Sequence, residues 1–337
     1  MTGPDGVTAV EPDAVPEDDE APGTADPVWR GEFRFTPFEV GDPGRAAAAP
    51  SYPDREHWDR PDTVVDGVVL AGDDGRPPLV LRAASSRGRG HRFHGKVRQD
   101  AYAFRCGGRF VVTAVADGLS SRPLSHVAAE VVARHGCHLV AKQLETAAPE
   151  DLDWPQILRV LAAKVLSAGR RELQGAPHPR VVEADAEVAR ELATTVLFAV
   201  ADLRPADGGH PVSVFAYGDS SAWVLRSGAR WEPLNRVKDE GAVVAGSATD
   251  ALPYLPTQPP GVVRTQLAPG DVLVLLSDGL GDPLDDGTGP VAEFLAEHWR
   301  CPPEPLAFAA HVDFARRSHD DDRTAVALWP DPAGGGS

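Results

Sequence analysis

Aspartates at the ends of predicted strands are the residues in this sequence that could do chemistry. Asp117 and Asp278 each end an apolar run and precede a glycine, whereas Asp100 and Asp321 come just before apolar runs. Carboxylates that converge repel one another unless cations lie between them, and oxygen-only ligand sets suit magnesium or manganese. If the strand ends meet in space, the pattern predicts a divalent-metal site.

A basic segment surrounds Asp100. Residues 82–109 contain eight arginines and lysines, and Asp100 is the only acidic residue among them. In an acidic chain, such a cluster beside a predicted metal ligand indicates that an anion binds there. The alternative is a solvated basic loop with no ligand.

Composition limits the class of protein. Of the 337 residues, 42% are hydrophobic and 25% are charged, which is ordinary for a soluble globular protein. The net charge of −17 argues against nucleic acid or an anionic membrane as the main partner. The three cysteines lie far apart, and we see neither a signal peptide nor an apolar run of membrane-spanning length. We therefore expect a cytoplasmic protein.

The chain divides into three parts. Residues 1–61 form an acidic tail rich in proline and alanine, which we predict to be disordered. Within it, the aromatic segment 28–41 is a candidate docking segment, either for the chain's own domain, which we favour, or for a partner. Residues 62–331 form the predicted domain, and residues 332–337 form a flexible tail.

The domain alternates predicted strands with long predicted helices. An apolar run that contains β-branched residues and ends at Asp117 indicates a strand buried on both faces. Residues 236–260 are irregular and could form a flap over a site. Further strands are predicted at 64–72, 78–85, 194–203 and 325–329, and over 212–228, where residues 218–219 interrupt the run. Helices are predicted at 124–148, 154–173, 291–299 and 306–317.

Three other catalytic motifs are incomplete or absent in this sequence. The segment 90–97 nearly matches a P-loop, but Val97 stands where a hydroxyl must reach magnesium. The sequence contains neither the G-x-S-x-G of an acyl-transfer serine nor the H-E-x-x-H of a zinc site. His91 and His94 lie in the basic segment, where a role on the surface or in the core is the simplest interpretation.

Six short motifs occur in an order that resembles the metal-dependent type 2C serine/threonine phosphatases, over residues 78–329. Six motifs in order are more specific than any one of them. The resemblance implies an α+β fold, a four-layer α/β/β/α sandwich of two antiparallel sheets flanked by helices. The motifs are RQDA at 98–101, ADG at 116–118, ATT at 193–195, GDS at 218–220, SDG at 277–279 and DDRT at 321–324.

The resemblance also implies two manganese or magnesium ions. Asp117 would bridge both ions, and the Gly118 carbonyl would bind one of them. Asp278 and Asp321 would complete the shell of the first ion, and Asp100 would hold the second. In relatives of this type, the ions activate a water that attacks phosphorus directly.

A third, weaker ion is implied at Asp219. The alternative for this residue is that it caps the turn between two strands.

The chain departs from the family pattern at several positions. Gln99 replaces a glutamate, Asp322 replaces the usual asparagine, and Leu119 stands where some relatives have a histidine. Two serines replace a glycine pair at 120–121, and Gly95 occupies the place of a phosphate-binding arginine. The candidates for substrate binding are therefore other basic residues nearby, namely Arg92, Lys96 and Arg98.

The implied activity is the hydrolysis of phosphoserine and phosphothreonine in proteins. Its partners would be phosphorylated protein substrates, including a Ser/Thr kinase or the targets of that kinase. One alternative is a catalytically weak pseudophosphatase that acts as a phosphoprotein-binding or regulatory module. Another is a phosphatase that serves a single anti-sigma-type or kinase partner through residues 29–41.

Overall fold

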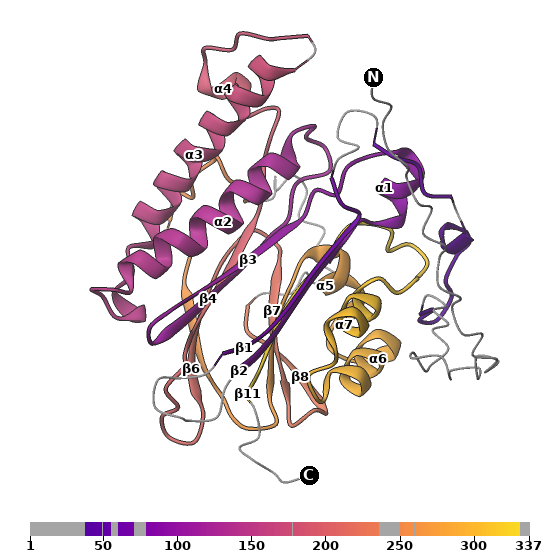
Figure 1. Ribbon diagram of the computed structural model, residues 1–337, viewed down its shortest axis with the longest axis vertical. Coiled ribbons are helices and arrows are strands. Elements are labelled where there is room, and N and C mark those ends of the chain that lie inside the picture. Colours follow the sequence, from indigo (N-terminus) through magenta and orange to yellow (C-terminus); the bar gives the residue numbers. More distant parts are fainter. Residues whose placement is uncertain are drawn as a thin grey trace, which may run out of the picture. The chain divides into compact units, whose positions relative to one another are not determined.

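Two antiparallel sheets stacked face to face form the centre of the protein in the computed structural model (Figure 1). The structure describes residues 38–48, 50–54, 60–70, 79–176, 178–235, 250–258 and 260–330. In spatial order, the first sheet contains β1 (Thr63–Leu70), β2 (Leu79–Ser86), β11 (Arg323–Pro330), β10 (Val272–Leu276), β7 (Ser221–Arg226) and β8 (Arg230–Pro233). The second contains β3 (Ala101–Gly107), β4 (Phe110–Ala116), β5 (Val196–Asp202), β6 (His210–Tyr217) and β9 (Val262–Leu267).

Helices cover the outer face of each sheet (Figure 1). On the second sheet lie α2 (Ser125–Gln143) and α3 (Trp154–Gly175), and on the first lie α5 (Asp278–Leu284), α6 (Gly289–Trp299) and α7 (Pro305–Val312). The short elements are η1 (Arg45–Ala48), α1 (Arg89–His94), η2 (Pro149–Asp151) and α4 (Asp185–Val188). The predicted four-layer α/β/β/α sandwich is confirmed.

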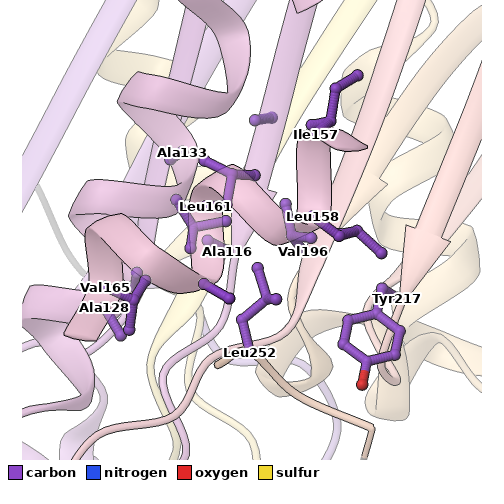
Figure 2. Close-up of a cluster of buried hydrophobic side chains, with 14 of the residues drawn as sticks. Ala116, Ala128, Ala133, Ile157, Leu158, Leu161, Val165, Val196, Tyr217 and Leu252 are labelled. Atoms are coloured by element: carbon purple, nitrogen blue, oxygen red, sulfur yellow. The ribbon is translucent and has the colours of Figure 1, made fainter. Parts of the chain in front are cut away.

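Apolar residues in the strands and helices account for how the layers pack. Leu81, Val115, Leu197, Leu275 and Val326 are fully buried between the sheets. Every residue of β5 is buried, so this strand is a nearly continuous apolar run rather than an alternating one. The helical layer on the second sheet is a separate cluster, in which side chains of α3 meet those of α2 and of the sheet (Figure 2).

Helix ends agree with the prediction where a local signal marks them. Helix α3 begins at Trp154, and the Asp153 side chain accepts a hydrogen bond of 2.9 Å from the Gln156 N–H. Pro155 occupies the first turn, where its missing N–H costs nothing. Within the described part of the chain, no helix is both long and apolar enough to cross a membrane.

Two predicted helices were too long. Helix α2 ends at Gln143 rather than at residue 148, and α7 ends at Val312 rather than at residue 317. The reason at α7 is tertiary, because the backbone beyond it pairs with the segment before the domain. The Ala315 N–H donates to the Phe38 carbonyl at 2.7 Å, and the Val40 N–H donates to the Ala315 carbonyl at 3.0 Å.

The segment 38–42 packs along the loop between α7 and β11. The Phe38 ring lies 5.3 Å from the Phe294 ring and 5.3 Å from the His311 ring, measured between centroids. Val40 is buried. Residues 28–37 of the candidate docking segment and residues 236–249 of the predicted flap lie outside the described residues, so the roles of both segments stay predictions.

His311 is expected to make stability depend on pH. Its ring is buried 4.5 Å from the His298 ring, and Nδ1 finds no hydrogen-bond partner in the described structure. Burial, and then the proximity of His298, lowers the pKa of His311 to about 4. The folded state therefore binds fewer protons than the unfolded state between about pH 4 and 6.5, and stability is lost as pH falls through this window.

The expected loss from this one group between pH 7 and pH 4 is about 2 kcal/mol, with allowance for solvent screening. His311→Phe should flatten the pH dependence of the free energy of unfolding, measured with urea. His178→Phe, at an exposed position, is the control and should leave the slope unchanged. Equal slopes in the wild type and in His311→Phe would contradict the assignment.

Candidate metal centre

Three aspartates from different elements meet at one end of the sandwich. One carboxylate oxygen each from Asp117, Asp219 and Asp278 lie within 4.8 Å of one another. Asp117 follows β4, Asp219 lies between β6 and β7, and Asp278 is the first residue of α5. The Asp278 N–H also donates to Asp117 Oδ2 at 3.3 Å. Residues as much as 161 positions apart in the sequence therefore share one site.

The Asp117 backbone is fixed from three sides. Its carbonyl accepts hydrogen bonds from the Thr195 N–H at 2.9 Å and from the Thr194 hydroxyl at 2.8 Å. Its own N–H donates to Thr195 Oγ1 at 3.3 Å. The neighbouring Gly118 forms a β-bridge with Thr194. The ATT motif thus holds the end of β4 in place.

Asp278 is placed by a close approach of two backbones. A Cβ atom at Gly279 would lie 2.0 Å from the Asp322 carbonyl oxygen, so only glycine fits after this aspartate. Before it, Ser277 and Thr324 exchange hydrogen bonds, with the Ser277 N–H donating to the Thr324 carbonyl and the Thr324 N–H to Ser277 Oγ, each at 3.0 Å. The start of α5 is therefore locked to the start of β11.

Asp100 lies buried immediately before β3 and is 4% exposed. Its Oδ2 has no hydrogen-bond partner among the described residues. Burial first, and then the negative charges of Asp322, Asp321 and Asp278, raise the pKa of Asp100 well above its usual value, against a hydrogen bond from Ser277. The electrostatic neighbours of Asp100 thus include two of the other predicted ligands.

The pKa values of Asp117 and Asp321 are raised in the same way. Burial and the charges of Asp100, Asp278 and Asp219 raise the pKa of Asp117 well above its usual value. Burial and the charge of Asp322 raise the pKa of Asp321, and His91 opposes that change. The structure therefore brings all the predicted aspartates into one electrostatic neighbourhood.

This donor set fits divalent cations. Oxygen atoms are the ligands that magnesium and manganese prefer, and a buried carboxylate oxygen without a hydrogen-bond donor is open to a cation. Asp100 Oδ2 is such an atom, and the oxygens of Asp117, Asp219 and Asp278 are already close together. The assignment of individual ions to Asp100, Asp117, Gly118, Asp219, Asp278 and Asp321 stays a prediction.

A second group lies beside the first. Ligand-type atoms of His91, Asp321 and Asp322 are also within 4.8 Å of one another. The Asp321 side chain is 45% exposed, whereas His91 and Asp322 are buried. Burial alone would lower the pKa of His91, but its contact with Asp322 and the charges of Asp321 and Asp100 raise it.

The three basic candidates have different surroundings. Arg92 donates to Asp313 at 3.1 Å and to Ser86 at 2.9 Å. Arg98 donates to Ser85 Oγ at 2.6 Å and to the Asp100 carbonyl at 2.5 Å, whereas the Lys96 side chain is exposed. Both arginines make internal contacts, so phosphate binding by Arg92, Lys96 or Arg98 stays a prediction.

Cavity size does not identify this site. A cavity of about 800 Å³ is lined by the β3–β4 turn and by the chain between α2 and η2. Asp100 precedes β3 and Asp117 follows β4, so this cavity lies at the opposite end of the hairpin from both aspartates. We place the site by its chemistry, because the carboxylates of Asp117, Asp219 and Asp278 converge there and burial raises the pKa values of Asp117 and Asp100.

Sequence reasoning missed the main role of Arg323. This buried side chain donates from Nε to the Gly279 carbonyl at 3.1 Å and also to the carbonyls of Phe314 and His319. Its guanidinium lies 4.3 Å from the centroid of the Phe314 ring, and burial lowers its pKa to about 10. The only sequence signal was its place in the DDRT motif, next to the predicted ligands.

Several solved structures resemble this one. The catalytic domain of the serine/threonine phosphatase PstP, in complex with two manganese ions, is 23% identical, with a TM-score of 0.44 and coverage of 74% of this chain and 98% of that one. RsbX in complex with magnesium is 11% identical, with a TM-score of 0.42 and coverage of 78% and 98%. The phosphatase domain of SpoIIE from Bacillus subtilis, with a regulatory fragment, is 16% identical, with a TM-score of 0.42 and coverage of 79% and 64%.

Sequence comparison identifies the family. A search of curated protein sequences returned no match. The family model described as protein phosphatase 2C matches residues 87–309, which is more than half of the chain. The match includes Asp100, Asp117, Asp219 and Asp278 and ends before Asp321. The chain therefore belongs to the protein phosphatase 2C family.

Proposed function

We propose that this protein hydrolyses phosphoserine and phosphothreonine in other proteins, with two manganese or magnesium ions and a third, weaker one. The observation that carries the proposal is the convergence of the carboxylates of Asp117, Asp219 and Asp278, together with the buried Asp100, whose charge acts on Asp117 and whose Oδ2 has no hydrogen-bond partner among the described residues. Family membership supports a metal-dependent protein phosphatase in general.

In this proposal the chain supplies the ligands and holds them in position. Asp117, Asp278 and Asp321 would hold the first ion, Asp117 and Asp100 the second, with the Gly118 carbonyl as a further ligand. Asp219 would hold the third. Bound divalent ions would supply Lewis acidity, which neutralises phosphoryl charge and lowers the pKa of water. The bonds from Thr194 and Thr195 to the Asp117 backbone hold the shared ligand rigidly.

The side chains around the centre limit how the leaving group is protonated. Leu119 follows the ADG motif and has no proton to give, and the exposed Ser120 donates to Asp321 Oδ2 at 3.4 Å. We therefore assign protonation of the leaving serine or threonine oxygen to water. Because Asp321 and Ser120 are open to solvent, the site can receive a phosphorylated side chain on a protein surface.

The proposed partners are phosphoproteins in the cytoplasm, including a Ser/Thr kinase or its targets. The charge of −17 supports a protein rather than a nucleic acid or an anionic membrane as the partner. The retained carboxylate set gives no support to an inactive phosphoprotein-binding module. Service to one partner through residues 29–41 remains a hypothesis, because only the end of that segment is described.

Turnover of a phosphothreonine peptide tests the proposal. We expect hydrolysis with Mn²⁺ that stops on chelation and resumes when the ion is restored. Asp278→Asn should lower the activity at limiting Mn²⁺ by about 100-fold, because it removes a ligand, while the thermal unfolding temperature without metal does not fall. Equal turnover in the wild type, in the chelated protein and in Asp278→Asn would refute the proposal.

A further inference from the structure

Asp322 uses both of its carboxylate oxygens inside the protein. The side chain is 2% exposed. Oδ1 accepts a hydrogen bond from the Gly88 N–H at 2.6 Å, and Oδ2 accepts one from the Gln99 N–H at 2.5 Å. His91 Nδ1 lies 2.9 Å from Oδ1. One carboxylate therefore joins the start of α1, the start of β3 and the start of β11.

The backbone groups that it joins are the neighbours of candidate ligands. Gln99 directly precedes Asp100, and Asp322 directly follows Asp321. The chain before α1 is packed tightly against the same region, because a Cβ atom at Gly88 would lie 2.3 Å from the Asp321 carbonyl carbon. A shift of Asp322 would therefore move the backbones that carry Asp100 and Asp321.

We propose that Asp322 is a positioning residue, whose two acceptor oxygens hold Asp100 and Asp321 in the arrangement that binds divalent cations. This inference rests on the proposed function. Asp322 is a less suitable metal ligand itself, since each oxygen already accepts a short hydrogen bond and the side chain is closed to solvent.

The geometry requires a carboxylate rather than an amide. Asparagine has one acceptor oxygen, and its NH₂ group would face a backbone N–H with no acceptor between them. The contact would leave one buried donor unpaired, which costs about 1–3 kcal/mol. Asp322 stands where the type 2C pattern usually has asparagine, and in this chain both of its oxygens face a backbone N–H.

His91 completes the arrangement. Two backbone N–H groups donate to this buried carboxylate, and His91 Nδ1 lies 2.9 Å from Oδ1 on the side of α1, in close contact but without the geometry of a hydrogen bond. His91 is itself buried and is held by its backbone, whose carbonyl accepts from the Lys96 N–H at 2.9 Å. The histidine in the basic segment thus has a role next to Asp322 that its sequence context did not indicate.

The dissociation constant for Mn²⁺ tests this inference, measured from the electron paramagnetic resonance of free Mn²⁺ with the full chain. Asp322→Asn should weaken Mn²⁺ binding about 10- to 100-fold, the range typical of residues that orient metal ligands. Saturating Mn²⁺ should restore most of kcat, because the ligands themselves remain. If Asp322 had a purely structural role, Asp322→Asn would lower the unfolding temperature and leave the Mn²⁺ dissociation constant unchanged.

Asp320→Asn is the matched control. It removes the same formal charge two residues away, where one carboxylate oxygen, Asp320 Oδ1, is buried without a hydrogen-bond partner among the described residues, so that no backbone N–H depends on it. We expect a change in the Mn²⁺ dissociation constant of less than about threefold, because the backbone N–H groups of Gly88 and Gln99 keep their acceptors on Asp322. An equal loss in Asp320→Asn and Asp322→Asn would show that charge alone is responsible and would overturn the inference.

His91→Gln is a milder second variant if Asp322→Asn does not fold. It removes the imidazole contact and keeps both backbone hydrogen bonds, so we expect Mn²⁺ binding to weaken about threefold to tenfold. If the wild type is active and the folded variants bind Mn²⁺ as tightly as the wild type does, the positioning role of Asp322 is wrong and the proposed function is unaffected. A wild type that binds Mn²⁺ but hydrolyses no phosphopeptide would instead refute the proposed function.

Discussion

Asp117→Asn is expected to lower phosphopeptide hydrolysis by about 1000-fold or more, because the proposed shared ligand of both ions is lost. The same change should make the metal-free protein more stable at pH 7 and above. Burial and the charges of Asp100, Asp278 and Asp219 raise the pKa of Asp117, so its carboxylate destabilises the metal-free fold once it ionises. An amide of the same shape removes this repulsion.

Proton linkage gives the direction in which pH changes the stability of the metal-free protein. A carboxyl group whose folded-state pKa is raised contributes stability that is present below its unfolded pKa and is lost as pH rises through the folded pKa. Thermal unfolding without metal should therefore depend less on pH in Asp117→Asn than in the wild type. Mn²⁺ should raise the unfolding temperature of the wild type much more than that of the variant. The account is contradicted if metal-free Asp117→Asn is less stable than the metal-free wild type, or if Mn²⁺ raises the unfolding temperatures of both proteins equally.

Arg323→Met should cause the largest loss of stability, about 3–5 kcal/mol in the free energy of unfolding. The change leaves the carbonyls of Gly279, Phe314 and His319 without the guanidinium that binds them. It also removes the contact with the Phe314 ring. Because Gly279 follows Asp278, the variant should also bind Mn²⁺ more weakly. Urea unfolding and Mn²⁺ titration measure the two effects separately.

Arg109→Met is the matched control. Arg109 also lies over a phenyl ring, 5.2 Å from the Phe110 centroid, and donates to Asp202 at 2.7 Å. Its side chain is 52% exposed, so we expect a loss below about 1 kcal/mol and unchanged Mn²⁺ binding. If both variants lose the same amount, the three backbone carbonyls are not what makes Arg323 important.

The sequence predicts the layers of this fold well, because its long elements carry strong local signals. The buried strand before Asp117 is a continuous apolar run, and α3 has a capping aspartate and an early proline. Asp-Gly pairs after apolar runs also indicate where Asp117 and Asp278 lie. Nothing in that pattern says that the two strand ends meet, and the expectation came from charge and from the resemblance in motif order.

The elements that sequence reasoning missed depend on contacts between distant residues. Helices α1 and α5 are six and seven residues long, too short for a clear helical period. Asp322 meets Gly88 across 234 positions and Gln99 across 223. Such contacts leave no local pattern, so the roles of Asp322 and Arg323 become visible only when the backbones are placed in space.

A crystal of the wild type soaked in Mn²⁺, with anomalous diffraction collected near the manganese edge, tests the central claim most directly. We predict at least two anomalous peaks a few ångströms apart, within coordination distance of the carboxylates of Asp117, Asp278, Asp321 and Asp100. Saturating Mn²⁺ with no peak at these carboxylates, or with peaks only elsewhere on the surface, would contradict it.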